Sequence, residues 1–423
     1  MSAARPPGEP VAVTGVGVVS PAGTTFEDTL DRVLAAKATA GPITLFDPEG
    51  LPCRIACEVT DLDVEGRIGA REARRIDRSG HLALIAAEDA LLASGLIQGD
   101  GDDRSLAADP TRVGVIAGSG VGGLTTLEDQ VRLHAEKGPK RVSPFLVPMM
   151  MVNGPAALIS IAHGFTGPSL CVATACATGA NAIGEAVRMV RDGSCDVAVA
   201  GATESSITPT AMAAFGRMGA LSGRNDDPST ASRPFDVDRD GFVMGEGAGF
   251  LVLESLAHAE ARGATILGTI AGYGRTCDAA HITAPSEDGV GAAAAVRLAL
   301  ADAGIDPSDI TQVNAHGTST PLNDAAEARA MVSVFGAGAV PVTSTKGVTG
   351  HLVGAAGAVE AAIALESARQ GLVPPVAGTS DVDPALDIDV VLGAPRSVTP
   401  GPVLSTSFAF GGHNAALVLV PAS

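Results

Sequence analysis

The stretch Val172-Ala-Thr-Ala-Cys176-Ala-Thr-Gly-Ala-Asn-Ala-Ile-Gly-Glu-Ala-Val187 joins a strand-like run to a helical pattern. Residues 168–173 predict a strand, and a helix follows until Asp192-Gly193 ends it. Cys176 thus falls in the first turn of that helix, where free backbone N–H groups and the helix dipole favour a thiolate. We expect a lowered thiol pKa and a nucleophile; the alternative is a structural cysteine in the core. The apolar positions of the helix are Ala180, Ile183, Val187 and Val190.

Composition limits the classes of protein. The chain has 423 residues, which favours two domains or two fused halves. It contains 52 glycines, no Trp and the single tyrosine Tyr273, which suits small-residue helices packed on β-branched strands. A net charge of −19 argues against nucleic acid or an anionic membrane as partner. An acidic partner would need a local basic patch.

The six cysteines form no paired framework. Cys53 and Cys57 have a C-x3-C spacing without a second pair, so we expect no metal site there. Free thiols suit a reducing compartment. The first seven residues lack the apolar core of a signal peptide, and residues 11–19 are too short to span a membrane. We therefore expect a cytoplasmic, soluble protein.

Strand and helix patterns alternate along the whole chain, with Gly-rich turns between them. They divide it into residues 1–262, which carry Cys176, and residues 263–423, which carry two histidines of interest. This α/β alternation predicts mainly parallel sheets covered by helices. The two halves repeat a similar element order, which indicates a distant internal duplication. No low-complexity linker separates them, so we expect one fused body.

One dense basic cluster stands out on this acidic chain. Residues 67–94 are largely helical in pattern and begin with five arginines. A patch of sign opposite to the net charge could dock an acidic partner; the alternative is an ordinary solvated face. The cluster consists of Arg67, Arg71, Arg74, Arg75 and Arg78.

Two other patterns carry less weight. Residues 112–123 match G-x-G-x-x-G after a strand, but no acidic residue follows at the spacing of a dinucleotide site. The three acids of residues 236–240 do not complete a calcium loop, because the last ligand position would be Gly247. We expect them to form ion pairs with Arg233 and Arg239 instead.

Two histidines follow strand patterns in the second half. His316 comes just past residues 310–314, among hydroxyl-bearing residues, while Lys346 and His351 precede a Gly/Ala-rich helix. A glycine-flanked loop around Phe410 lies near the end of the chain. Groups at the carboxyl ends of parallel strands converge on one crevice. Either histidine alone would be read as structural, but together with Cys176 they predict a catalytic Cys/His/His set.

Five ordered motifs resemble those of the elongating β-ketoacyl-acyl-carrier-protein synthases, which are condensing enzymes of the thiolase fold. The resemblance extends from about Val11 to Val420. It implies an α/β protein of two pseudo-repeated halves in a layered α-β-α-β-α body. The motifs are T-A-C-A-T-G-A, A-S-R-P-F-D-x-x-R-D-G-F, N-A-H-G-T-S-T, S-T-K-x-x-x-G-H and F-x-F-G-G-x-N.

The resemblance implies a role for each of these residues. Cys176 would take the acyl group from a carrier-protein thioester, and the N–H groups of Cys176 and Phe410 would form the oxyanion hole. His316 and His351 would hydrogen-bond the malonyl thioester oxygen as CO₂ leaves, because the developing negative charge sits on that oxygen. Lys346 would hold the His351 region, with Glu360 as its ionic partner.

The resemblance also implies substrate contacts and partners. Thr283, Thr318 and Thr320 would contact the malonyl carboxylate or the pantetheine. Phe410 would gate the nucleophile, while Val121, Leu146 and Phe215 would line the acyl channel, Leu146 from the partner subunit. Arg71, Arg74 and Arg75 would dock the acyl carrier protein. We expect a homodimer, or a heterodimer with a chain-length factor, and no metal or cofactor apart from the carrier's phosphopantetheine.

Differences from related classes narrow the expected function. Initiating synthases carry Asn where His351 stands, degradative thiolases need a second cysteine near residues 409–414, and chain-length factors lack the nucleophile. We expect a 3-oxoacyl synthase that extends a fatty acid or polyketide chain by two carbons. The ketosynthase subunit of a type II polyketide system, a thiolase and a non-catalytic carrier-binding scaffold remain as alternatives. Ala409 stands where the family usually has Gly, so we also expect a stiffer gate.

Overall fold

The computed structural model describes residues 8–99 and 104–422, so the expectation about the first seven residues lies outside it. The strands of the N-terminal half pair in the series antiparallel, antiparallel, parallel, parallel. In pairing order they are β1 (Val11–Val19), β9 (Gly247–Ser255), β8 (Val197–Glu204), β6 (Val113–Gly118) and β7 (Ser169–Leu170).

The C-terminal half repeats this series. Its strands are β10 (Gly268–Cys277), β17 (His413–Pro421), β16 (Val403–Ala409), β11 (Gln312–Asn314) and β12 (Pro341–Thr343), and β14 (Asp389–Val390) extends the edge. Residues 11–13 pair with residues 268–270 and join the halves into eleven strands, counted over the described residues. The repeated series supports the predicted duplication.

The expectation of mainly parallel sheets is wrong, because antiparallel pairs are as frequent as parallel ones in this sheet. A short 3₁₀ turn at residues 410–412 joins β16 to β17. Between β8 and β9 a long loop with α9 (Pro209–Met218) intervenes, and no crossover helix covers the sheet there. Without such a crossover the next strand returns in the opposite direction.

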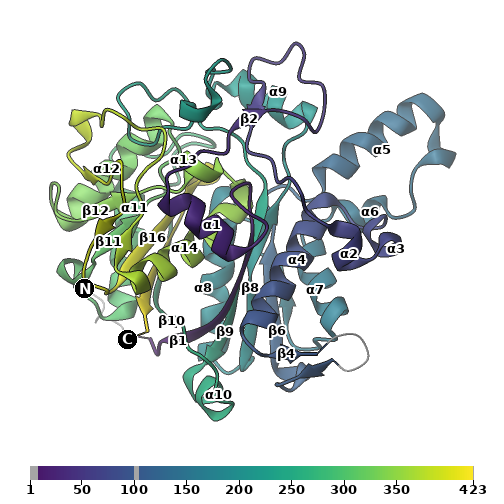
Figure 1. Ribbon diagram of the computed structural model, residues 1–423, viewed down its shortest axis with the longest axis horizontal. Coiled ribbons are helices and arrows are strands. Elements are labelled where there is room, and N and C mark those ends of the chain that lie inside the picture. Colours follow the sequence, from purple (N-terminus) through teal and green to yellow (C-terminus); the bar gives the residue numbers. More distant parts are fainter. Residues whose placement is uncertain (1–7, 100–103, 423) are drawn as a thin grey trace.

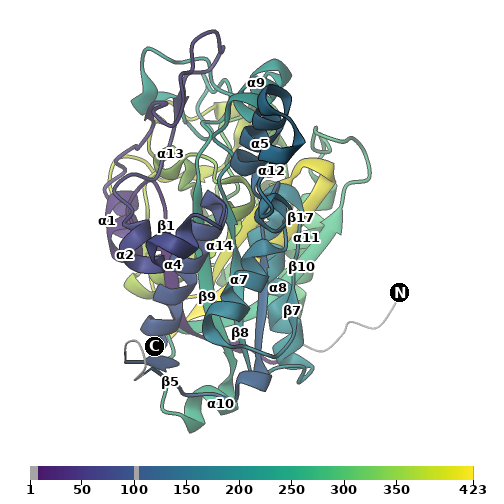
Figure 2. The ribbon, with the colours of Figure 1, turned by 90° about the vertical axis from the view of Figure 1, so that its right-hand side faces the viewer.

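Helices and strands form five layers (Figure 1). Two helices lie in the middle, α8 (Thr178–Arg191) and α14 (Ala356–Gln370), and one buried cluster joins them to strands of both halves. The outer face of the N-terminal half is covered by α4 (Arg78–Ala93) and α7 (Gly154–His163), which lie toward the viewer in Figure 2. On the opposite outer face lie α11 (Val290–Ala303) and α12 (Pro321–Phe335). This is the predicted layered arrangement.

Glycines let the two middle helices cross closely. A Cβ on Gly179 would lie 2.6 Å from the backbone nitrogen of Ala358, and one on Gly357 would lie 2.8 Å from that of Ala180. Both distances are shorter than real Cβ contacts, so side chains there would push the helices apart. The close crossing brings the starts of α8 and α14 together.

The remaining elements are short or peripheral. The arginine-rich segment is not one helix but three, because Gly69 and Asp77 interrupt it. The strand expected at 168–173 is limited to β7. Within the described ranges, no helix combines the length and apolar character that crossing a membrane requires. The other helices are α1 (Phe26–Leu34), α2 (Val64–Ile68), α3 (Ala70–Ala73), α5 (Leu124–Lys137), α6 (Leu146–Met150), α10 (Leu256–Ala261) and α13 (Lys346–Thr349). The other strands are β2 (Gly41–Pro42), β3 (Ile55–Ala56), β4 (Ile97–Gln98), β5 (Ser105–Leu106), β13 (Leu372–Val373) and β15 (Arg396–Ser397).

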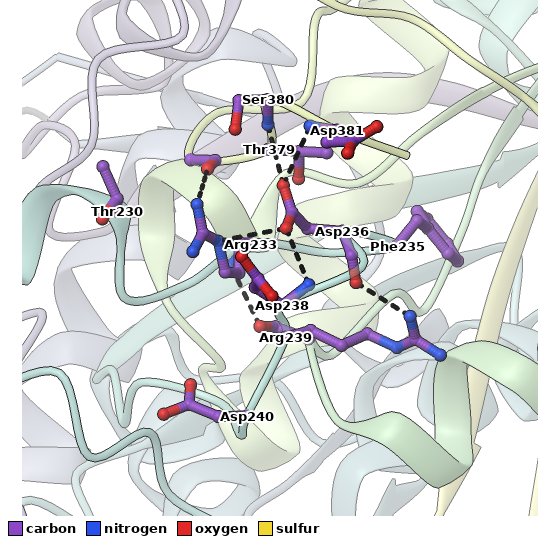
Figure 3. A network of polar contacts seen from close by, with 12 residues as sticks. Thr230, Arg233, Phe235, Asp236, Asp238, Arg239, Asp240, Thr379, Ser380 and Asp381 are labelled. Atoms are coloured by element: carbon purple, nitrogen blue, oxygen red, sulfur yellow. Dashed lines mark hydrogen bonds and ion pairs between the residues drawn. The ribbon is translucent and has the colours of Figure 1, made fainter. Parts of the chain in front are cut away.

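Of the two ion pairs expected for the acidic loop before β9, the one with Arg233 forms, whereas Arg239 pairs with an acid outside residues 236–240 (Figure 3). Arg233 lies 3.5 Å from Asp236, whose carboxylate also accepts backbone N–H groups of Ser380 and Asp381. Arg239 pairs with Asp383 at 2.9 Å. This network ties the loop to residues of the C-terminal half.

Candidate active site

A cavity of about 450 Å³ lies where the starts of α8 and α14 meet. It contains Cys176, His316 and His351, so the structure brings the predicted set together. Aromatic side chains surround it, which gives the site an apolar wall. Its lining includes Val121, Phe215, Phe242, Thr283, Thr318, Thr320, Phe408 and Phe410.

Cys176 lies in a 3₁₀ turn, Ala175–Ala177, just before α8 rather than in its first turn. Ala175 has a φ of 48°, a left-handed conformation that is strained for a residue with a Cβ. This strained turn aims the Cys176 side chain into the cavity.

The expectation of a lowered thiol pKa is wrong for the empty site. Burial raises the pKa of Cys176 to about 12. Lys346 and the backbone N–H groups of Phe410 and Cys176 act in the opposite direction, but burial outweighs them. The resting residue is therefore a thiol, which needs a proton acceptor before it can attack a thioester.

His351 is the acceptor nearest to the nucleophile. Its Nε2 lies 3.0 Å from Cys176 Sγ. The backbone of His351 is fixed on both sides, since its N–H donates to Val243 and its carbonyl accepts from Gly245. Burial and Lys346 hold the pKa of His351 well below its usual value, so the ring is neutral at pH 7. Its Nδ1 has no hydrogen-bond partner among the described residues, so no neighbour there fixes its tautomer.

His316 differs from His351 because a neighbour fixes its tautomer. Lys346 Nζ lies 3.4 Å from His316 Nδ1, and an ammonium group can only donate. Burial, followed by Lys346 and His351, holds the pKa of His316 well below its usual value. The neutral ring therefore accepts at Nδ1 and carries its proton on Nε2.

The tautomer of His316 decides whether Cys176, His316 and His351 could bind a metal ion or instead offer a hydrogen-bond donor to a substrate. The ligand atoms of Cys176, His316 and His351 lie within 4.8 Å of one another, a spacing that a metal ion could bridge. A ring nitrogen that carries a proton cannot ligate a metal. The Lys346 contact thus makes His316 a hydrogen-bond donor toward the cavity and disfavours a metal there.

Lys346 itself lies behind the histidines and does not line the cavity. It pairs with Glu360 of α14, the predicted ionic partner. The resemblance assigned Lys346 to the His351 region, but its hydrogen bond is to His316. The reason is that α13 starts directly beside the loop that follows β11.

Two buried carboxylates organise the loops around the site, and sequence reasoning missed both. Glu327 of α12 accepts the N–H groups of His316 and Gly317, and burial raises its pKa to about 7. Glu204, at the end of β8, accepts the N–H groups of Gly120 and Gly354. A sequence signal exists for Glu204 alone, which ends an apolar run of small residues; Glu327 stands between Asp324 and Arg329 on an ordinary mixed helix.

The Phe410 loop approaches the nucleophile from β16. Ala409 has φ −127° and ψ 158°, an extended conformation open to any residue. Its Cβ therefore causes no backbone strain in this state of the loop. Gly411 and Gly412 have φ values of 83° and 74°, so they carry the bend. The stiffer gate inferred from Ala409 concerns movement of the Phe410 loop away from this conformation, so it stays a prediction.

Most of the predicted substrate-contact residues line the cavity, but Leu146 of α6 does not. Thr318 and Thr320 are hydrogen-bonded to each other at 2.9 Å.

The five arginines of the predicted basic cluster separate. Arg78 turns inward and pairs with the buried Glu246 at 2.6 Å. Arg71 keeps 78% of its side chain exposed, and Arg74 is also exposed. Arg75 lies over the ring of Phe145, 5.2 Å from its centre.

A buried thiol beside two neutral imidazoles, at the junction of two repeated α/β halves, defines a condensing enzyme of the thiolase-like fold. Residues 8–259 match the family described as "Beta-ketoacyl synthase, N-terminal domain", and residues 267–380 match "Beta-ketoacyl synthase, C-terminal domain". The chain belongs to the β-ketoacyl synthase family, and it is an acyltransferase.

Individual relatives agree with this assignment. The 3-oxoacyl-[acyl-carrier-protein] synthase 2 of Synechocystis sp. is 46% identical over 96% of this chain and 97% of its own length. The structure titled "The ishigamide ketosynthase/chain length factor" is 34% identical with a TM-score of 0.90, and covers 98% of this chain and 100% of its own. A type II polyketide synthase acyl-carrier protein in complex with its ketosynthase matches at 29% identity with a TM-score of 0.88, over 98% and 100% of the two chains. The predicted fold is confirmed.

Proposed function

We propose that this chain is a 3-oxoacyl-[acyl-carrier-protein] synthase, which condenses a Cys176-bound acyl group with a malonyl thioester and releases CO₂. The observation that carries the proposal is the pairing of one thiol with two neutral imidazoles of different character. His316 is a fixed donor, whereas His351 can accept or donate. Acyl transfer needs an acceptor for the thiol proton, and decarboxylation needs two hydrogen-bond donors to the enolate oxygen.

In the first half-reaction, Cys176 attacks the carbonyl carbon of an acyl thioester. The thiol proton passes from Sγ to Nε2 of His351, 3.0 Å away, and then to the departing pantetheine sulfur. The backbone N–H groups of Cys176 and Phe410, which approach the sulfur, stabilise the tetrahedral oxyanion. One C–S bond breaks and another forms, so the site regains its protonation state.

In the second half-reaction, the malonyl C–C bond breaks and its electron pair forms an enolate. Nε2–H groups of His316 and His351 donate to the enolate oxygen. For His351 the ring proton moves from Nδ1 to Nε2 between the two half-reactions, a change that no described partner of Nδ1 opposes. The aromatic surroundings help: the Phe242 and Phe408 rings lie 5.2 Å and 6.2 Å from His351 and His316. Such a desolvated site favours loss of charge from a carboxylate. The enolate carbon then attacks the acyl group, and the Cys176 thiolate leaves and takes up one proton.

We further propose that an acyl carrier protein delivers both substrates, docking at Arg71, Arg74 and Arg75. A structural relative is such a carrier in complex with its ketosynthase. Thr283, Thr318 and Thr320 would face the pantetheine, while Val121, Phe215 and a partner's copy of Leu146 would line the acyl channel. Reversing Arg74 and Arg75 to Glu should weaken carrier binding, and the loss should shrink with added salt. An unchanged affinity would remove these arginines from the proposal.

The division at residue 262, a cytoplasmic location and the absence of a bound cofactor remain parts of this proposal. The phosphopantetheine of the carrier would be the prosthetic group involved.

A second candidate function is the ketosynthase subunit of a type II polyketide heterodimer. The similarity to a ketosynthase/chain length factor structure favours it. Exposed apolar side chains on β7 and α6 fit an interface with either a second copy or a different chain. Leu170 is 51% exposed and Val147 is 59% exposed. Purification of the chain alone separates the two candidates: an active homodimer supports chain elongation by this chain, whereas an inactive monomer supports the heterodimer.

The central test uses two substitutions of the nucleophile. Cys176→Ala should abolish formation of 3-oxoacyl product from acyl- and malonyl-carrier substrates. Cys176→Gln should lose condensation but keep malonyl decarboxylation, because the two histidines remain. Product from Cys176→Ala would refute the proposal. Loss of decarboxylation in Cys176→Gln would contradict the separate roles of the cysteine and the histidines, and an unmodified chain that makes no product but binds the carrier would favour a scaffold. Cleavage of acetoacetyl-CoA by the unmodified chain would instead indicate a thiolase.

A further inference from the structure

The strained turn at Ala175 needs support from its surroundings. A left-handed residue with a Cβ is strained and persists only where neighbours fix it. Thr174, which precedes it, is held at three points. Its N–H donates to Thr178 Oγ1 at 2.9 Å, its carbonyl accepts from Ala177, and its hydroxyl accepts from Asn181. The first two bonds lie within the turn itself, and only the third comes from outside it.

Asn181 makes this external bond with one defined end of its amide. Its Nδ2 lies 2.8 Å from Thr174 Oγ1, and its Oδ1 accepts the hydroxyl of Tyr273 at 2.7 Å. A hydroxyl that donates to Oδ1 forces the amide nitrogen toward Thr174. Asn181 is only 5% exposed, whereas Thr174 and Tyr273 are half-buried and line a hollow beside it.

Tyr273 reaches this position from β10, across the boundary between the two halves. Its ring lies flat on α8 at Gly184, where an added Cβ would be 2.4 Å from ring atoms. Burial raises the pKa of Tyr273, so its hydroxyl stays a donor. The hydroxyl also lies 3.2 Å from Glu185 Oε1, but that carboxylate is already paired with Arg275. The shorter hydrogen bond, to Asn181, is the one that connects Tyr273 to the turn that carries Cys176.

We propose that Asn181 and Tyr273 are positioning residues for the reaction, because they fix Thr174 and through it the turn that holds Cys176 Sγ 3.0 Å from His351. The inference rests on the proposed acyl transfer at Cys176. Neither residue touches the reacting atoms. Their loss should therefore slow acylation of Cys176 and leave steps that do not use its sulfur unchanged.

The test is Tyr273→Phe, which removes one hydroxyl and keeps the ring on Gly184. We expect the rate of Cys176 acylation by an acyl-carrier substrate to fall about fivefold, with KM unchanged. Malonyl decarboxylation, measured in the Cys176→Gln background, should not change. Asn181→Ala, which removes the amide and with it the bonds to both Thr174 and Tyr273, should give an equal or larger loss of acylation. Glu185→Gln is the matched control, since it alters the other acceptor of the hydroxyl and should leave acylation unchanged.

Two results would overturn the inference: equal acylation rates in Tyr273→Phe and the unmodified chain, or a parallel loss of acylation and decarboxylation, which indicates general destabilisation. A chain that never acylates Cys176 would refute the proposed function instead, so the two failures are distinguishable. The composition supplies a further readout. Tyr273 is the only tyrosine and the chain has no Trp, so the tyrosine fluorescence of the protein comes from Tyr273 alone. We expect this fluorescence to change when Cys176 is acylated. That change should be absent in Asn181→Ala, and its persistence there would count against the hydrogen-bonded connection.

Discussion

Alkylation of Cys176 by iodoacetamide should be slow at pH 7 and should accelerate up to about pH 10 without levelling off. The burial that raises the pKa of Cys176 to about 12 is the cause. At pH 7 a thiol of that pKa is about 1 part in 10⁵ thiolate, whereas an ordinary thiol of pKa near 9 is about 1 part in 100. Burial thus lowers the reactive fraction about a thousandfold.

The more basic thiolate is also the stronger nucleophile. With a Brønsted coefficient of about 0.4–0.5, three pKa units recover a factor of roughly 20. The net expectation is alkylation roughly 50-fold slower than for an exposed thiol at pH 7, rising close to tenfold for each pH unit.

The measurement is the mass increase of the intact protein against time from pH 6 to 10. It should be made in a Cys277→Ser background, because Cys277 is exposed and would otherwise be labelled first. Cys176→Ala in the same background measures labelling of the other cysteines, of which Cys171 is partly exposed. A plateau in rate between pH 6 and 8 would refute the reasoning, because it would mean a stable thiolate–imidazolium pair and a lowered pKa.

Three other predictions concern packing and charge. Gly179→Ala should lower the free energy of unfolding in urea by about 1–3 kcal/mol, because its Cβ would meet α14. Gly154→Ala should change it little, because the added Cβ would make only an ordinary contact, 3.5 Å from the carbonyl oxygen of Pro148; equal effects would refute the close crossing. Lys346→Met should lower the free energy of unfolding by about 3–5 kcal/mol, because Glu360 would stay buried without its partner. The double variant Lys346→Met/Glu360→Leu should recover most of that loss. A double variant as unstable as the single one would show that the unpaired charge is not the cause. Malonyl decarboxylation by Cys176→Gln should be constant from pH 6 to 8, because both histidines are neutral there and would lose that state only as pH falls far below 6.5; a fall in rate through pH 6.5 would contradict the neutral rings.

The positions of the reactive groups could be predicted from the sequence because each follows a local rule. Cys176 lies between a strand pattern and a helix pattern, and His316 lies just past a strand. The rule that groups at the carboxyl ends of strands converge predicted that Cys176 and His316 would meet. The two residues follow β7 and β11 in different halves, so the meeting itself depends on the close crossing of α8 and α14.

The pKa of Cys176 could not be predicted, because it depends on a competition that sequence does not measure. The position of Cys176 near the start of a helix gives only the sign of the contribution that the backbone N–H groups and the helix dipole make to its pKa. The depth of burial depends on side chains such as Phe242 and Val353, which come from distant segments. The contact of Lys346 with His316 rather than the His351 region likewise depends on the path of a loop.

Strand direction was mispredicted for a related reason. Alternating β and α patterns do not reveal whether a helix crosses the sheet or lies beside a long loop, as α9 does. Glu204 and Glu327 were missed because an acid that accepts backbone N–H groups has no spacing rule, and only its burial makes it unusual.

The repeated strand series has a consequence for how such an enzyme could arise. Ala175 and Val353 have φ values of 48° and 47°, and each precedes one of the two middle helices. One half uses this turn to present a thiol, and the other half supplies both imidazoles. A single ancestral half would have had to associate with a second copy of itself to bring two such helix starts together. Fusion makes that encounter intramolecular, so it no longer depends on protein concentration. After fusion, one half could keep only the nucleophilic cysteine and the other half only the two histidines.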